Sequence, residues 1–296
     1  MRASAWLSLL CGAACSVACL VKSFEVDPAP TEGAAGDDNG SAGTSNNIPS
    51  GPGPQHIGES LFHDSASGSD SASAHLTDAT FELPAGTKAG DFLLVFFGSD
   101  HTLHLTTQTL GQMGWTLHDQ HGEQGDDGQG TYLLYRFADG TEPTSIVFPG
   151  INDNTYGNGV QGLLTVYRGV NKTKPVNAYE VAQVDHGTDD MRTIETPTPA
   201  VTTSVGNCLL IAGLSPDSAV DAPVVTSWPE GFDEHQVSVQ NPTNPNPFGW
   251  ANIYSAERHL AKAGSVPGSK FVWDIATPET VYHGALSFVL ALAPAE

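Results

Sequence analysis

The amino-acid sequence predicts an all-β protein, a single β-sandwich of jelly-roll type built from two internally similar halves. Three observations lead to this fold class. Gly (32) and Pro (20) are abundant, whereas charged residues make up only 15% of the 296 residues. Short apolar runs alternate with turn-forming residues, and segments of the first half recur in order in the second. Few charges, many turn formers and short apolar runs are typical of sheet proteins.

The apolar runs have the length of strands. Each spans four to six residues, is rich in β-branched or aromatic side chains, and is bounded by Gly, Pro, Asn or Asp. They are residues 92–97, 163–167, 208–211 and 286–290. Helices would need ten or more periodic residues, so we expect buried strands and no amphipathic helix after the first segment of the chain.

Four matches in the same order connect the two halves. Residues 89–95 recur 116 residues later as 205–211, Gly114-Trp115 as Gly231-Phe232, Tyr132 and Arg136 as Tyr254 and Arg258, and 162–166 as 284–288. Such ordered self-similarity predicts a duplicated strand set. Each half has too few strands to cover both faces of a sheet, so we expect the halves to pack together as one sandwich. The recurring Gly-aromatic step predicts a turn glycine followed by a core ring, and the two arginines should pair with acids across the sheet.

The first 56 residues predict export and a tether. Arg2 and the apolar stretch after it are typical of a signal peptide, assigned to residues 1–19. The small residues before Cys19 predict lipidation of that cysteine; Cys15 is a competing site, and ordinary cleavage without a lipid is the third possibility. Residues 20–56 are poor in large apolar side chains and predict a disordered tether, which leaves 57–296 as the folded domain. Cys208, inside an apolar run, is expected to be a buried core residue rather than a reactive thiol.

Charge narrows the choice of partners. Asp and Glu number 33 against 11 Lys and Arg, a formal net charge of −22. Phosphate backbones are bound by clustered Lys and Arg, so we expect no nucleic-acid partner. Together with the signal segment, the composition predicts an exported protein, lipid-anchored in the cell envelope or extracellular. The expected partners are the outer membrane, through the lipid anchor, and an extracellular glycan or protein.

Several short motifs carry a family resemblance. They are Gly90-Asp91-Phe92-Leu93-Leu94, Gly114-Trp115-Thr116, the Tyr132 to Arg136 spacing, Tyr167-Arg168-Gly169-Val170 and Pro175-Val176-Asn177-Ala178. Across residues 60–293 the chain resembles the duplicated β-sandwich modules of bacterial secreted surface proteins and phage tail-like proteins, here behind a bacterial lipoprotein-type signal. The resemblance implies the fold and says little about activity.

Two kinds of metal site are conceivable. His101 and His104, like His118 and His121, are three residues apart, a spacing that points to opposite faces of a strand and so disfavours zinc. Calcium is favoured, because carboxylates in polar loops supply the oxygens that it prefers. We expect it at Asp126 and Asp127, in a Gly-rich loop. Further acidic or amide loops occur at 152–154 and 185–190.

Exposed aromatic rings beside hydrogen-bonding side chains are typical of sugar-binding surfaces. Asn152, Asp153, Asn154 and Tyr156 form one such group, and Trp250 belongs to another in a Pro-rich loop. We expect these five residues to bind ligand. The alternative for Trp250 is that it packs at the start of the strand containing Tyr254.

Catalytic motifs are missing from the sequence: it contains no nucleophile elbow, zinc-protease helix, phosphate-binding loop or dinucleotide fingerprint. The sequence therefore favours a surface-exposed, non-enzymatic protein that binds a glycan or protein partner or serves in envelope structure, and no catalytic residue is assigned. The alternative is a secreted carbohydrate-active hydrolase that uses loop carboxylates, with Glu257 or Asp274 as examples.

Overall fold

The computed structural model describes residues 52–64, 77–99, 102–122, 130–152, 160–187, 192–218, 223–239, 252–275 and 283–296. These residues belong to one compact unit. Cys15, Cys19 and the rest of the predicted signal peptide lie outside the described residues, as does the predicted tether up to residue 51. No helix in the described part of the chain has the length and apolar character needed to span a membrane.

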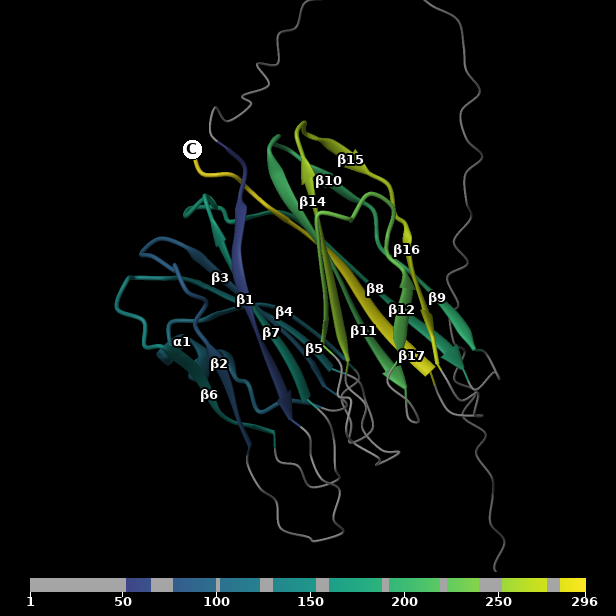
Figure 1. Ribbon diagram of the computed structural model, residues 1–296, viewed down its shortest axis with the longest axis horizontal. Coiled ribbons are helices and arrows are strands. Elements are labelled where there is room, and N and C mark those ends of the chain that lie inside the picture. The colour runs from purple at the N-terminus through teal and green to yellow at the C-terminus, as the bar shows by residue number, and fades with distance from the viewer. Residues whose placement is uncertain are drawn as a thin grey trace, which may run out of the picture. The chain divides into compact units, whose positions relative to one another are not determined.

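Two five-stranded antiparallel sheets form the centre of the unit (Figure 1). In spatial order the first sheet contains β1 (Gln55–Asp64), β7 (Val160–Arg168), β3 (Phe92–Ser99), β5 (Gly130–Phe137) and β4 (Thr116–Gly122). The second sheet contains β13 (His235–Val239), β14 (Ile253–Leu260), β11 (Cys208–Ser218), β17 (His283–Leu292) and β8 (Val176–Gly187).

Smaller elements cover the outer faces of these sheets. The first sheet carries a pair of strands, β2 (Thr77–Glu82) and β6 (Ser145–Asn152), and the helix α1 (Thr107–Gln112). The second sheet carries β12 (Val224–Ser227), β16 (Lys270–Asp274) and β9 (Thr193–Pro197), with the pair β10 (Val201–Thr203) and β15 (Gly264–Val266). The chain is therefore an all-β sandwich, as the sequence predicts.

Three apolar cores hold these layers together. The central core lies between the two large sheets and contains Phe92, Leu94, Phe96, Leu163, Leu209, Ile211, Phe288 and Leu290. A first outer core lies between the first sheet and its covering strands, and a second outer core lies between the second sheet and its own. Both faces of each large sheet are consequently buried, and for this reason β3 reads as an unbroken apolar run, all of it buried.

Two local sequence predictions on described residues are confirmed, the Gly-aromatic turns and the burial of Cys208. Gly114 and Gly231 have positive φ angles of 75° and 77°, which favour glycine, and each precedes a buried ring, Trp115 or Phe232. Cys208 is a buried free cysteine, and burial raises the pKa of its thiol to about 11. The sequence did not predict the six-residue helix α1. Thr106 caps this helix, because its hydroxyl accepts a hydrogen bond from the Thr109 N–H.

The prediction for the two arginines is wrong for Arg136. This side chain stacks over Trp115, 5.1 Å from the ring centroid, and its nearest acid is Glu142, 4.0 Å away in the turn that follows β5. The arginine therefore covers Trp115 at the edge of the first outer core instead of pairing with an acid across the sheet.

The two large sheets have the same strand order. Taken in that order, β1, β7, β3, β5 and β4 correspond to β8, β17, β11, β14 and β13. Leu93 pairs with Arg136 as Leu210 pairs with Arg258, in agreement with the predicted match of the two arginines. The predicted match of Leu93 with Leu209 is one residue out of register, because Leu93 faces an outer core and Leu209 faces the central core. The correspondence of strands is what a duplication predicts, and the duplication itself stays a prediction.

The two sheets approach closely at Gly98. A Cβ atom added there would lie 2.6 Å from Ile253 Cγ2 and 2.6 Å from Ser215 Oγ, both in the second sheet. We expect Gly98→Ala to lower the free energy of unfolding by about 1–3 kcal/mol, because the sheets must separate to admit the methyl group. Denaturant unfolding measures the change.

Gly111→Ala is the matched control. Gly111 lies in α1, and a Cβ there would meet nothing within 4 Å. Its substitution should leave stability unchanged or raise it by about 0.5–1 kcal/mol. Equal effects of the two substitutions would contradict close contact at Gly98.

Candidate functional site

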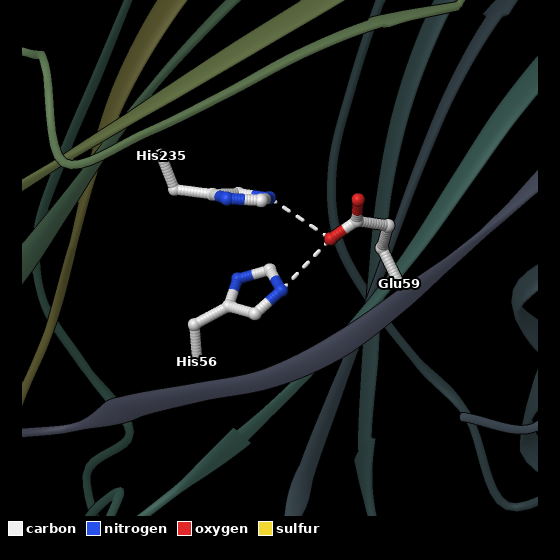
Figure 2. Close-up of side chains that lie close together, drawn as sticks. All are labelled: His56, Glu59 and His235. Atoms are coloured by element: carbon white, nitrogen blue, oxygen red, sulfur yellow. Dashed lines mark hydrogen bonds and ion pairs between the residues drawn. The ribbon is translucent and has the colours of Figure 1, made fainter. Parts of the chain in front are cut away.

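A cluster of histidine and glutamate side chains lies where the edge strands β1 and β13 meet. Its centre is Glu59 on β1, whose Oε2 atom accepts hydrogen bonds from two imidazoles (Figure 2). His56 Nε2, three residues earlier on the same strand, is 2.8 Å away. His235 Nε2, at the start of β13, is 2.9 Å away. The two rings lie 4.1 Å apart, so the three side chains form one compact group shared by both sheets.

Behind His56 lies a buried carboxylate. Glu257 on β14 is only 4% exposed, and its Oε1 atom accepts hydrogen bonds from His56 Nδ1 at 2.9 Å and from the Tyr167 hydroxyl at 2.8 Å. Burial, then the neighbouring charge of Glu257, raises the pKa of Tyr167 well above its ordinary value, so the phenol stays a donor. A buried carboxylate is tolerated where such donors compensate its desolvation.

His56 bridges two carboxylates. Burial lowers the pKa of its imidazole, but the hydrogen bond to Glu257 and the negative charges of Glu257 and Glu59 outweigh burial and raise this pKa above 6.5. An acceptor at each nitrogen favours the doubly protonated, positively charged form of the ring when no metal is bound. The imidazole therefore joins Glu59 of the first sheet to Glu257 of the second.

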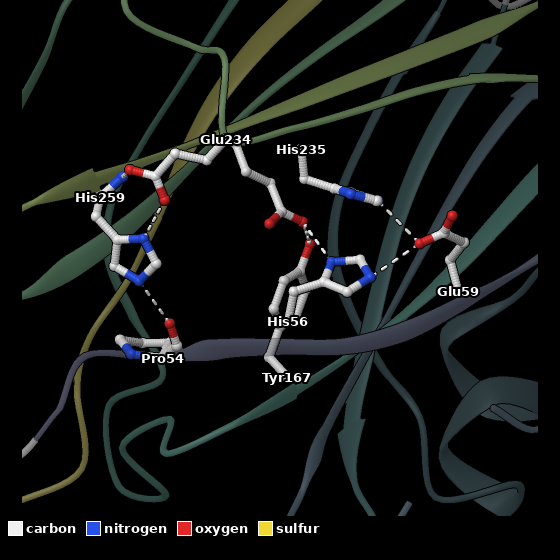
Figure 3. Close-up of polar contacts among 8 residues, drawn as sticks. Pro54, His56, Glu59, Tyr167, Glu234, His235 and His259 are labelled. Atoms are coloured by element: carbon white, nitrogen blue, oxygen red, sulfur yellow. Dashed lines mark hydrogen bonds and ion pairs between the residues drawn. The ribbon is translucent and has the colours of Figure 1, made fainter. Parts of the chain in front are cut away.

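The hydrogen bonds among Glu59, His56, His235, Glu257 and Tyr167 form a seam between the two sheets, and a third histidine, His259, continues this seam toward the beginning of the folded unit (Figure 3). His259 on β14 is bonded through Nδ1 to Glu234, and its Nε2 donates to the Pro54 carbonyl at 2.9 Å. The backbone N–H of His259 also donates to Glu234, at 2.7 Å. Pro54 immediately precedes β1, so this contact attaches the entering chain to the second sheet.

The cluster has the composition of a metal site. The ligand atoms of His56, Glu59 and His235 all lie within 4.8 Å of one another, and among the described residues no other group of this kind occurs. In contrast, His118 packs between the rings of Tyr135 and Tyr179, and burial lowers the pKa of its imidazole. His121 is paired with Asp119 at 2.8 Å. His118 and His121 therefore have separate partners and form no metal-binding group among the described residues, while His101 of the other pair lies outside them.

A surface cavity of about 470 Å³ lies at the start of β3 and the end of β7. Its lining contains Asp91, which is 2% exposed. The carboxylate accepts from Arg168 Nε at 2.9 Å, from Arg168 Nη2 at 2.7 Å and from the Lys88 backbone N–H at 2.8 Å. Two motif segments of the sequence thus meet through this ion pair. The Asp91 carboxylate is fully engaged by these hydrogen bonds, so its ion pair with Arg168 holds the turn that lines the cavity. Asp91 is therefore not available as a catalytic acid.

The residues predicted from the sequence to bind ligand or calcium cannot be compared with this geometry. Asp126, Asp127, Asp153, Asn154, Tyr156 and Trp250 lie outside the described residues, and for Asn152 only the backbone is described, as the end of β6. Sequence reasoning considered Glu257 only as a possible catalytic acid and missed His56, Glu59, His235 and Tyr167. The sequence does contain two short His/Glu motifs, His56-x-x-Glu59 and Glu234-His235. Their spacing along the chain does not indicate that the two motifs meet in the fold.

No protein-family model, curated protein or solved structure matches this chain.

Removing the donors of Glu257 tests how the seam contributes to stability. Tyr167→Phe should lower the free energy of unfolding by about 1–2 kcal/mol, because a buried carboxylate loses a hydrogen bond. Glu257→Ala should cost about 3 kcal/mol or more, since it leaves the phenol and the charged His56 without their shared acceptor. Glu257→Gln, which keeps the size and one acceptor, should fall between them. Unchanged stability in Tyr167→Phe would refute this assignment.

The His259–Glu234 pair predicts a dependence on pH. Burial lowers the pKa of His259, but its bonds to Glu234 and Pro54 outweigh burial and raise it above 6.5. A raised native pKa contributes stability that is complete below about pH 6.5 and is lost as pH rises through the native value. Both side chains are more than a third exposed, so the coupling should stay below about 1 kcal/mol.

A double-mutant cycle with His259→Gln and Glu234→Gln, followed by denaturant unfolding at about pH 6 and about pH 8.5, measures this coupling. The coupling energy should be smaller at the higher pH. Equal values at both would show that the charge of His259 plays no part.

Proposed function

We propose that this protein is an exported, lipid-anchored surface protein whose β-sandwich binds an extracellular glycan without catalysing a reaction. The observation that carries the proposal is that two features of the folded unit lie at opposite ends. The chain enters at one end of the two large sheets, and the segments predicted to bind ligand are attached at the other.

The entry point lies at the end of the first sheet where β1 starts. Gln55, its first residue, pairs with Arg168, the last residue of β7. At the opposite end of the same sheet, Asp64 pairs with Val160, and Gly122 pairs with Gly130. The segment 123–129, which contains the predicted calcium ligands, lies between Gly122 and Gly130 at this second end. The segment 153–159, which contains predicted sugar ligands, leads into Val160 at the same end.

The second sheet has the same orientation. Val239 pairs with Ile253 where β13 ends and β14 begins, and these two termini flank the segment that contains Trp250. Ile253 contacts the position of Gly98, near the end of β3, so these termini of the two sheets lie together. Both predicted sugar-binding groups, 152–156 and Trp250, are therefore attached at the same end of the sandwich.

The location of chain entry and predicted binding segments at opposite ends suits a tethered binding protein. A lipid at Cys19 and a flexible tether of about 30 residues, with a root-mean-square reach of roughly 30 Å, would join the sandwich at its entry end. The tether would then not obstruct the opposite end. Loops held on a rigid sandwich are a common place for binding residues. Tyr and Trp rings with Asn and Asp side chains match the alternating apolar and hydroxyl surfaces of a glycan.

A glycan array probed with the purified full-length protein tests this function, with and without calcium. We expect retention of at least one glycan, and a loss of affinity of at least tenfold in Tyr156→Ala and Trp250→Ala, because stacking on an aromatic ring is removed. Lys174→Ala, an exposed residue at the entry end, is the control and should bind as the wild type does.

Two outcomes would redirect the proposal. If no glycan is retained, or if the aromatic variants bind normally, glycan binding at these residues is refuted, and a protein partner or a purely structural role takes its place. Shortening of a retained glycan during incubation would favour the alternative of a carbohydrate-active hydrolase.

A further inference from the structure

We propose that His56, Glu59 and His235 bind a zinc ion that links the edge strand β1 of the first sheet to the edge strand β13 of the second. This inference is independent of what binds at the far end of the sandwich. It rests on the donor set, on the spacing of the ligand atoms, and on the buried carboxylate that orients one of the imidazoles.

The spacing of the ligand atoms is close to what the ion needs. The Glu59 carboxylate oxygen lies 2.8 Å from His56 Nε2 and 2.9 Å from His235 Nε2. Tetrahedral zinc with bonds of about 2.0–2.1 Å places its ligand atoms about 3.3 Å apart. Each imidazole nitrogen therefore needs to move away from the carboxylate oxygen by only a few tenths of an ångström, and the two nitrogens already lie within 4.8 Å of each other. Figure 2 shows both imidazoles directed to the same carboxylate oxygen of Glu59.

The site is also accessible. The side chains of His56, Glu59 and His235 are 20%, 31% and 34% exposed, so solvent reaches the cluster from one side. An ion can enter without rearrangement of the cores, and a water molecule can complete a four-coordinate shell. Two imidazoles, one carboxylate and one water form a known zinc combination.

An independent observation orients the imidazole of His56 for this role. Its Nδ1 donates to Glu257, a carboxylate that is 4% exposed and is held in place by the Tyr167 hydroxyl. Histidines that bind metals commonly donate their second nitrogen to such a carboxylate, which holds the ring and directs the other nitrogen to the ion. The same ring is hydrogen-bonded to Glu257 through Nδ1 and to Glu59 through Nε2.

The donor set selects the class of ion. Calcium takes six to eight oxygen ligands, and magnesium keeps an octahedral shell of oxygens. Imidazole nitrogen is instead a ligand of zinc and of the other late first-row transition metals. Two nitrogens and a carboxylate therefore favour zinc over the calcium expected from the acidic loops. The partial negative charge that Glu59 and Glu257 place around the cluster further favours a divalent cation.

Binding should stabilise the association of the two large sheets. His56 and Glu59 belong to one sheet and His235 to the other, so the ion can bind fully only when the sheets are together. At a hundredfold excess of free zinc over its dissociation constant, the melting temperature should rise by about 5–10 °C.

The test uses the purified full-length protein, with its exposed thiols alkylated and metals removed by chelation. Isothermal titration with zinc chloride should give one site per chain in the wild type. Glu59→Gln, which keeps the size and hydrogen bonding of the side chain, and His235→Ala should each weaken that site at least tenfold and abolish the thermal shift. Cobalt(II), which absorbs visible light strongly in a tetrahedral site, should give this absorption in the wild type but not in Glu59→Gln or His235→Ala.

His63→Ala is the matched control. His63 lies on the same strand, and its ring is bonded to Gln161 of the neighbouring strand, 2.7 Å away. The His63→Ala variant should bind zinc as the wild type does. Calcium or magnesium chloride should not bind at this site, so neither salt should cause a shift in melting temperature that depends on Glu59 or His235. The proposal is overturned if the wild type does not bind zinc, or if Glu59→Gln and His235→Ala bind it unchanged. The cluster would then be an ion-pair network that joins the sheets without a metal. Circular dichroism of each variant shows that a loss of binding is not a loss of fold.

Discussion

Burial of both faces of the two large sheets is the constraint on which the rest of the structure depends. Along β3, Leu93, Val95 and Phe97 enter an outer core while Phe92 and Phe96 enter the central core. A strand in this position has no solvent face, so every residue must be apolar or paired. At one margin of the sheets, between β1 and β13, ionisable side chains form a network that crosses from one sheet to the other.

The same constraint explains what the sequence could predict. Unbroken apolar runs identified the central strands, and the Gly-aromatic steps at Gly114 and Gly231 identified two turns, because these signals are local. The register of the internal match was not available in this way. In a strand buried on one face, a slip of one residue places polar side chains in the core. In β3 and β11 both faces are apolar. Aligning Leu93 with Leu209 instead of Leu210 therefore leaves the apolar pattern intact, and only the structure distinguishes the two alignments.

The candidate metal site was beyond sequence reasoning for a different reason. Its ligands come from strands that are far apart in the chain: Glu59 and His235 are separated by 176 residues. His56 lies at the boundary of the predicted tether, because an edge strand that follows a Gly- and Pro-rich segment has only a weak apolar signal. The spacing of histidines drew attention to His118 instead, which contacts Tyr179 across the opposite margin of the two sheets. Contacts between halves depend on how the sheets are stacked, and local spacing carries no information on stacking.

The seam also determines what kind of unit the two halves make. The second half buries Glu257, and the groups that compensate its charge, Tyr167 and His56, belong to the first half. Separation of the halves would expose the central core and at the same time remove both donors from that carboxylate. Apolar burial makes the association favourable, whereas the charged hydrogen bonds restrict it to one register, since a sliding of the sheets would leave Glu257 buried and unpaired. We therefore expect that neither half folds as an autonomous domain, and that a change at the seam alters the stability of the whole sandwich.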